Sequence, residues 1–341
     1  MKKILPVTPA KQYFAPFLAE VAEIIPVTAS LTRIVFRHPD LLHAALGREV
    51  LDQRMKIIFP GESGITPTYD RHEWRAQRAA LPPALKGVMR TYTVRSWQEY
   101  PDFGEVCIDF VRHDDRYGLA GPASKWLAAV NIGDRVNLVL PRKGMPVTGI
   151  EFAPGDARSI VLVGDETALP AIANILISVS AQSPGKTVHA FVEVPTRADT
   201  HYFQHPDITW LIRDEHAVLS PGQHILTALQ QYIPALCRRD ENLEEAVPSA
   251  DRNAAIGRSV TAGSHEDANE IIWQTPTYSK SGEELAHDTS VATDDLAQYF
   301  WIAGESTMVT SVRRYLVHQC GIQRRQVAFM GYWKQGVAMR G

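Results

Sequence analysis

The stretch IVLVGDETALPAI, residues 160–172, decides the fold of the second half of the chain. Its first four residues, Ile160 to Val163, are all apolar, as expected for a strand that is buried on both faces. A turn follows, and a helical pattern then runs from Ala168 to about Val179. A buried strand that leads through a turn into a helix is the repeating unit of a parallel sheet covered by helices.

The same pattern of apolar strands and helices continues to the end of the chain. Further short apolar runs occupy residues 188–194, 209–212, 299–303 and 326–330, and a helical pattern over 307–319 separates the last two. Continuous apolar strands that alternate with helices predict an α/β domain with a doubly wound parallel sheet.

Residues 21–153 have a different pattern. Apolar residues alternate with others in two segments, 106–111 and 136–140, and short β-prone runs occupy 28–36 and 55–59. Pro and Gly interrupt these runs, as is typical of an antiparallel β-barrel. One helix is expected inside the barrel, over Lys125 to Val130, with Ser124 as its N-cap.

A chain of 341 residues exceeds the usual size of one domain. We therefore expect an N-terminal extension over 1–20, a β-barrel domain over 21–153 and an α/β domain over 154–341. Residues 238–296 are polar and lack a sustained period, which favours an insertion, a lid or a disordered loop within the second domain.

The composition narrows the function. The net charge of −3 gives no sign of a nucleic-acid partner. The three cysteines, Cys107, Cys237 and Cys320, are far apart in the sequence, which favours neither a metal site nor a disulfide framework. Redox chemistry would therefore need a bound cofactor. No signal peptide or membrane-spanning segment is indicated, which makes the cytoplasm the expected location. The composition does not indicate an oligomeric state.

The segment RTYTVR, residues 90–95, is the first candidate binding element. On a strand, Arg90 and Tyr92 point to one side, where they could hold a phosphate and stack on a flat ring. Thr93 follows where a backbone or hydroxyl donor could face a flavin N5. An exposed strand with alternating polar residues explains this spacing equally well.

Three turns could add phosphate or nucleotide contacts. The segment GPAS, residues 121–124, precedes a helix, whose N-terminus suits a diphosphate, although a simple helix cap is the alternative. The segments 163–170 and 301–306 are both strand ends followed by helices, where dinucleotides bind in open α/β sheets. Asp165 and Glu166 would repel a phosphate unless they face away or accept from ribose hydroxyls.

The ordered segments RTYTVR (90–95), DFVRH (109–113), GPASKW (121–126), VGDETALPAI (163–172), WIAGES (301–306) and GYWKQG (331–336) resemble the siderophore-interacting protein family. That family comprises FAD-dependent ferric-siderophore reductases of the ferredoxin-reductase-like superfamily. The resemblance runs from about residue 25 to 341 and skips 238–296, where the chain departs from the compact family pattern.

The resemblance implies FAD and NADPH as cofactors, with the chemistry carried by the flavin and not by a catalytic side chain. It implies that the flavin contacts are Arg90, Tyr92, Thr93, Arg95, Asp109, His113, Gly121, Ala123 and Ser124. It implies that the nicotinamide-side contacts are Asp165, Glu166, Thr167, Pro170, Gly304, Glu305 and Ser306.

The substrate implied is a ferric siderophore, in which hard oxygen ligands hold Fe(III) in an anionic complex. The candidate basic contacts are Lys56, Arg142, Lys143 and Lys334, each of which could also be an ordinary surface charge. Arg197 could meet the 2′-phosphate of NADPH, whereas Glu193 would suit the 2′-hydroxyl of NADH, so NADPH rests on the resemblance and NADH is the alternative.

Two other functions are compatible with the sequence. One is a reductase on the same scaffold that serves free flavin, ferredoxin or a quinone. The other is a non-catalytic protein that binds flavin or siderophore. The pair Tyr92–Thr93 disfavours the second, because a simple binding protein has no need to present N5.

Overall fold

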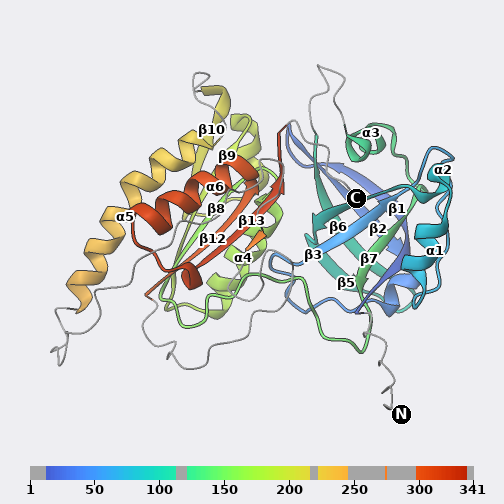
Figure 1. Ribbon diagram of the computed structural model, residues 1–341, viewed down its shortest axis with the longest axis horizontal. Helices are drawn as coiled ribbons and strands as arrows, with labels where there is room; N and C mark the ends of the chain where they lie inside the picture. Colours follow the sequence, from blue (N-terminus) through green and yellow to red (C-terminus); the bar gives the residue numbers. More distant parts are fainter. Residues whose placement is uncertain (1–12, 113–120, 216–221, 245–272, 275–296, 336–341) are drawn as a thin grey trace, which may run out of the picture. The chain divides into compact units, whose positions relative to one another are not determined.

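The computed structural model describes residues 13–112, 121–215, 222–244, 273–274 and 297–335, in two compact units (Figure 1). The first unit is formed chiefly by residues up to Glu151, and the second chiefly by residues from Phe152 onward. The short segment Ala173–Ser178 belongs to the first unit.

The first unit contains a seven-stranded antiparallel sheet in the order β4-β3-β7-β1-β2-β6-β5. Its strands are β1 (Phe14–Pro26), β2 (Leu31–His38), β3 (Arg54–Phe59), β4 (Val88–Thr93), β5 (Ser96–Glu99), β6 (Gly104–Val111) and β7 (Arg135–Pro141). Alternate residues of these strands, such as Phe17, Ile57 and Leu138, are fully buried in one core, as the period-2 pattern requires. The antiparallel, barrel-like sheet predicted from the sequence is confirmed. Its first strand begins at Phe14, inside the range expected to be an N-terminal extension.

The helices of the first unit differ from the sequence prediction. One helix was expected, but the structure contains α1 (Trp74–Ala80), α2 (Pro83–Lys86) and α3 (Pro122–Ala129), together with the 3₁₀ turn η1 (Pro39–His43). Helix α1 buries only Trp74, so it shows no apolar period. Helix α3 begins at Pro122 with Gly121 at the N-cap, so the prediction of Ser124 as the cap is wrong. Proline is well suited to this first helical position, because its φ is already helical.

The second unit contains a six-stranded sheet in the order β10-β9-β8-β12-β13-β11. Its strands are β8 (Ser159–Asp165), β9 (Thr187–Val194), β10 (Ile208–Ile212), β11 (Trp273–Gln274), β12 (Gln298–Glu305) and β13 (Val327–Trp333). All described pairs are parallel except β11 with β13, and the predicted parallel sheet is confirmed. Strand β11 lies inside the segment 238–296, of which residues 245–272 and 275–296 lie outside the described part.

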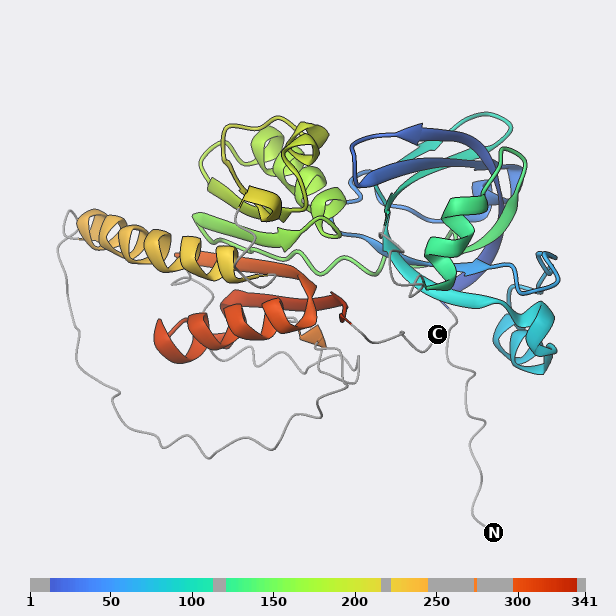
Figure 2. The ribbon, with the colours of Figure 1, turned by 90° about the horizontal axis from the view of Figure 1, so that it is seen from above.

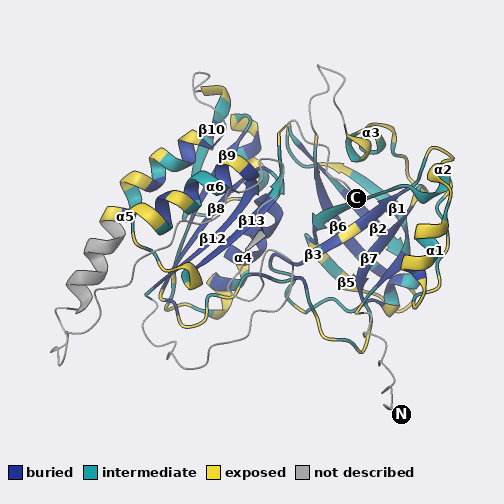
Figure 3. Cartoon of the chain, in the orientation of Figure 1, coloured by how far each residue is buried: buried dark blue, intermediate teal, exposed yellow. Residues whose placement is uncertain are grey.

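Helices cover both faces of this sheet. Helix α4 (Leu169–Gln182) lies on one face, and α5 (Gln223–Glu244) and α6 (Ser306–Arg314) lie on the other (Figure 2). The central strands β8 and β12 are buried along their whole length (Figure 3). Trp301 of β12 is fully buried. The remaining turns are η2 (Arg197–Tyr202), η3 (Arg213–Glu215), η6 (Arg324–Gln326) and a π turn over Tyr315–Gln319. Among the described helices, none is long and apolar enough to cross a membrane.

Candidate functional site

Strand β4 carries the segment RTYT at one edge of the first sheet. Arg90 lies opposite Ile57 and Tyr92 lies opposite Met55, so both belong to the face of the strand whose neighbours are buried. The Arg90 guanidinium donates to the carbonyl of Met89, and burial lowers its pKa. Because β4 is an edge strand, every second backbone N–H along it has no ladder partner and can donate to a ligand.

Tyr92 is part of an aromatic cluster that helix α3 closes. Its ring centroid lies 4.6 Å from that of Phe110 and 6.2 Å from that of Phe59. Trp126 of α3 packs against the same two phenylalanines, with centroid distances of 5.0 Å to Phe59 and 5.7 Å to Phe110. Burial raises the pKa of Tyr92, so its phenol is neutral and the ring presents an apolar surface. Thr93, the next residue, is buried.

Helix α3 contacts β4, and Ala123 in its first turn packs against the same core cluster as Tyr92. Its N-cap, Gly121, makes no side-chain capping bond. Pro122 has no N–H, so Ala123 and Ser124 carry backbone donors that the helix itself cannot satisfy. The structure therefore brings together the two elements that the sequence proposed for a flavin ring and its diphosphate.

The other flavin-side residues are placed differently. Asp109 is buried on β6, and both of its carboxylate oxygens accept from Arg33, at 2.7 and 2.9 Å. Arg95 donates its backbone N–H to the carbonyl of Cys107 and its guanidinium to Asn174 within the first unit. His113 lies outside the described residues.

In the second unit, Asp165 joins the two turns at the carboxyl ends of β8 and β12. One carboxylate oxygen accepts from the backbone and hydroxyl of Thr167. The other accepts from the backbone N–H of Glu305 and from the indole of Trp333, each at 2.8 Å. Gly304 has φ +141°, and a Cβ there would lie 2.6 Å from that same oxygen. Glycine is therefore required for the two turns to approach this closely.

Glu305 caps helix α6 through its side chain. Its carboxylate accepts from the backbone N–H groups of Thr307 and Met308, which places a negative charge at the positive end of the helix. Ser306 donates to the carbonyl of Trp333, and Pro170 is buried in the first turn of α4. A diphosphate at the N-terminus of α6 would therefore meet the Glu305 carboxylate.

Glu166 and Arg213 form a buried ion pair beside these turns, 2.7 Å apart. The other carboxylate oxygen of Glu166 is buried and accepts no hydrogen bond among the described residues. Burial, and then the Asp165 carboxylate, raise the pKa of Glu166 to about 7, against the opposing effect of Arg213. Burial acts to lower the pKa of Arg213, but Glu166 and Glu193 raise it above its ordinary value. The sequence analysis did not identify Arg213. The pattern that could have identified it is a basic residue directly after a predicted strand.

The two residues considered for nucleotide selectivity have opposite surroundings. Glu193 is buried and accepts from the backbone N–H of Gly222 and from Arg213, at 3.0 and 3.2 Å. The Glu193 carboxylate is therefore already engaged within the second unit. Arg197 is exposed, and its guanidinium pairs with Glu215 at 2.6 Å.

The four basic candidates do not form one cluster. Lys56 donates to the Thr91 hydroxyl on the face of β3 and β4 that also carries Arg54, and Lys143 pairs with Glu99. Lys334 follows β13 in the second unit. Burial, followed by the charges of Arg54 and Arg90, lowers the pKa of Lys56. Arg54 itself pairs with Glu151 at 3.1 Å.

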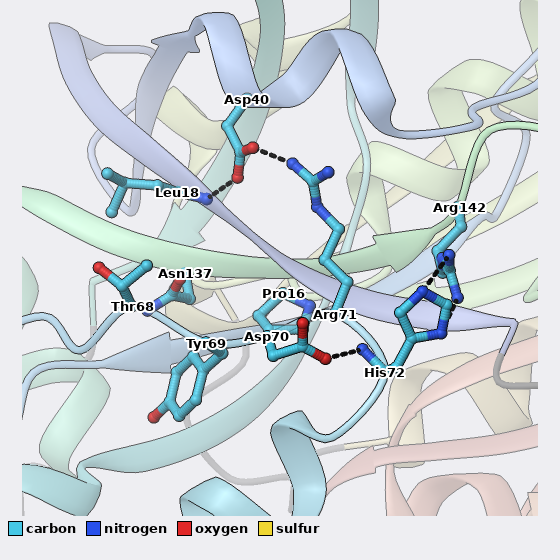
Figure 4. Close-up of a pocket in the computed structure, with 10 residues that line it drawn as sticks. All are labelled: Pro16, Leu18, Asp40, Thr68, Tyr69, Asp70, Arg71, His72, Asn137 and Arg142. Carbon is cyan, nitrogen blue, oxygen red and sulfur yellow. Dashed lines mark hydrogen bonds and ion pairs between the residues drawn. The ribbon is translucent and has the colours of Figure 1, made fainter.

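Arg142 alone of the four lines a cavity of about 450 Å³ on the first unit (Figure 4). Its guanidinium lies 3.2 Å from each ring nitrogen of His72, and it forms no ion pair with a described carboxylate. Arg71, in the same cavity, pairs with Asp40. No group of three His, Cys, Asp or Glu side chains in the described ranges could hold a metal ion.

Comparisons with known proteins identify the family of this chain. The family model of the siderophore-interacting FAD-binding domain matches residues 20–145, and that of the siderophore-interacting protein matches residues 157–336. The ferric vibriobactin reductase ViuB of Vibrio cholerae is 28% identical over 265 residues, which cover 76% of this chain and 88% of that protein. The NADPH-dependent ferric-chelate reductase of Escherichia coli is 33% identical over 117 residues, or 33% of this chain and 42% of that protein.

A solved structure supports the fold. A siderophore utilization protein from T. fusca superposes with a TM-score of 0.59 at 24% identity, covering 97% of both chains. The second family model alone covers more than half of the sequence. The chain belongs to the siderophore-interacting protein family, and it shares the fold of that siderophore utilization protein.

Proposed function

We propose that the chain is a cytoplasmic, FAD-containing ferric-siderophore reductase that takes its electrons from NADPH. The observation that carries the proposal is the packing of Tyr92, on an edge strand, and of Ala123, in the first turn of α3, against the same core cluster. The membership of this chain in the siderophore-interacting family is the second support. Relatives named as ferric vibriobactin and ferric-chelate reductases support the reaction class.

The donors around β4 and α3 fit FAD. The Arg90 guanidinium and the backbone N–H groups of Ala123 and Ser124 would hold the diphosphate. The neutral Tyr92 ring would stack on the isoalloxazine, and Thr93 would present a donor to N5. Arg95 and Asp109 would act through the strands that they fix, since both are engaged in hydrogen bonds. When bound, FAD supplies the conversion of a two-electron hydride into single electrons for iron.

The second unit would hold the nucleotide. The proposed wall is formed by Asp165, Glu166, Thr167, Pro170, Gly304, Glu305 and Ser306. These residues lie at the carboxyl ends of parallel strands, where dinucleotides bind in this kind of sheet. Arg197 is the proposed partner of the 2′-phosphate. Its guanidinium is exposed, which lets it reach a ligand.

The substrate would be an anionic ferric complex. Arg142 suits it best, because its guanidinium contacts the His72 imidazole and forms no ion pair with a described carboxylate, although Asp70 lines the same cavity. Lys56 would add its own positive charge to this attraction. Lys143 and Lys334 remain proposed contacts at other positions on the surface.

Anaerobic reduction tests the proposal in two steps. Purified protein with FAD is mixed with NADPH, and the loss of flavin colour is followed. A ferric tris-catecholate complex is then added, and Fe(II) is trapped by a chromogenic chelator. Free flavin, ferredoxin and a quinone serve as competing acceptors. Faster turnover with one of these acceptors than with ferric complexes would replace the proposed substrate.

A further inference from the structure

A second cavity, of about 420 Å³, lies in the second unit beside the edge strand β10. It is bordered by η2, η3 and the first turns of α5. Its lining includes Arg197 and Glu215, an aromatic wall from Trp210, and the neutral hydrogen-bonding groups Thr200 and Thr227. The volume is within the range of about 300–1,000 Å³ that is typical of small-molecule sites.

The position of this cavity identifies a ligand class. Arg197 and Glu215 both follow strands, since β9 ends at Val194 and β10 ends at Ile212. The cavity therefore begins at the carboxyl edge of the parallel sheet, where nucleotides bind. It is bordered by β10 and by the turn that follows β9, whereas the Asp165 turn follows β8. A dinucleotide with its nicotinamide at the Asp165 turn would place its adenosine end here.

Arg197 and Glu215 are the guanidinium and the carboxylate among the lining residues. Both contacts from the arginine, through Nε at 2.7 Å and Nη2 at 2.6 Å, reach the same carboxylate oxygen of Glu215. The side chains are 73% and 40% exposed, so both remain accessible to a ligand while they hold each other. The pair therefore makes the cavity neutral overall and occupies the arginine that would bind a phosphate.

We infer that this cavity receives the adenosine end of the nucleotide and that Glu215 sets the choice between NADPH and NADH. The inference rests on the proposed function for its ligand. A 2′-phosphate is repelled by the Glu215 carboxylate and must compete with it for Arg197. A 2′-hydroxyl can donate to the same carboxylate. Glu215 is thus a specificity-determining residue that weakens the preference for NADPH.

The test uses two ligands that differ only in the 2′-phosphate, 2′,5′-ADP and 5′-AMP. Their dissociation constants are measured by calorimetry on the FAD-loaded protein, so that the result does not depend on hydride transfer. The variants are Glu215→Gln, which keeps the shape and removes the charge, and Arg197→Ala. Glu20→Gln is the matched control, because Glu20 is also 40% exposed and pairs with an arginine, Arg135, in the first unit.

Glu215→Gln should tighten 2′,5′-ADP by about tenfold while 5′-AMP changes by less than about twofold. Arg197→Ala should weaken 2′,5′-ADP by about tenfold or more, and Glu20→Gln should change neither ligand. Unchanged affinity for 2′,5′-ADP in Glu215→Gln, or equal tightening of both ligands, would overturn the inference. The proposed function is tested separately by NADPH reduction of FAD in the unmodified protein, which can succeed or fail whatever the variants show.

Discussion

Replacing Glu166 by Gln should remove a dependence of stability on pH that this buried carboxyl imposes. Burial and the Asp165 carboxylate raise the pKa of Glu166 from its ordinary 4.5 to about 7. Between these two values, the folded chain binds the proton and the unfolded chain releases it. The stability that Glu166 contributes is therefore complete below pH 4.5 and is lost as the pH rises to about 7.

The size of the effect follows from the shift. A pKa that moves from 4.5 to about 7 corresponds to about 3 kcal/mol of unfolding free energy, at about 1.36 kcal/mol per pH unit. Solvent does not reduce this value much, because the Glu166 side chain is only 6% exposed. Glutamine has the same shape as the protonated acid and stays neutral. Arg213 keeps its second partner, Glu193, in the variant.

Urea unfolding of the FAD-saturated protein at pH 5 and pH 8 measures the effect. At pH 5, Glu166→Gln should differ little from the unmodified protein, because the native side chain is already mostly protonated. At pH 8, the variant should gain about 2.5 kcal/mol relative to that difference, because part of the full effect is already lost at pH 5. Other titrating groups cancel, because they are shared by both proteins. Glu20→Gln, on the surface of the first unit, should show no such change.

A difference between variant and unmodified protein that is equal at the two pH values, within about 0.5 kcal/mol, would refute this reasoning. It would mean that Glu166 is ionised throughout this range. The Arg213 pairing would then outweigh burial at this position.

Three further predictions follow from individual contacts. Gly304→Ala should lower the unfolding free energy by about 2 kcal/mol or more, because the new Cβ would meet Asp165 and the backbone φ is unfavourable for alanine. Unchanged urea unfolding would contradict the close approach of the two turns. Asp109→Asn should destabilise the protein by about 1.5–3 kcal/mol in the same assay, because it removes the carboxylate charge from a pair that forms two hydrogen bonds with Arg33. A loss of unfolding free energy near zero would show that the pair contributes little. Arg142→Ala should slow the reduction of a ferric tris-catecholate by about tenfold while NADPH still reduces FAD at the unmodified rate; equal slowing of both steps would remove Arg142 from the substrate site.

Much of the fold follows from local patterns. Continuous apolar runs predict the fully buried strands of the second unit, and alternating apolar residues predict the strands of the first unit. Strands β8 and β6 lie where these two patterns occur. Helix α1 was missed because it rests on one buried side chain, Trp74, which creates no period. The start of β1 was missed although Ala15, Phe17 and Ala19 alternate in the core.

The candidate site was less accessible to sequence reasoning. The segments 90–95 and 121–124 could be proposed one by one, because a strand and a helix start have local signatures. The contact between Glu166, Arg213 and Glu193 could not, because these residues follow or end three different strands and meet only through the register of the sheet. The role of Glu305 as the cap of α6 likewise depends on the rotamer and not on the residue type.

Anaerobic stopped-flow mixing of the FAD-loaded protein with NADPH, followed by a ferric tris-catecholate, tests the central claim most directly. The account predicts that NADPH bleaches the flavin. It also predicts that the ferric complex restores the flavin colour while a chelator traps two Fe(II) for each NADPH consumed. A flavin that stays oxidised under NADPH, or a reduced flavin that the ferric complex does not reoxidise, would contradict it.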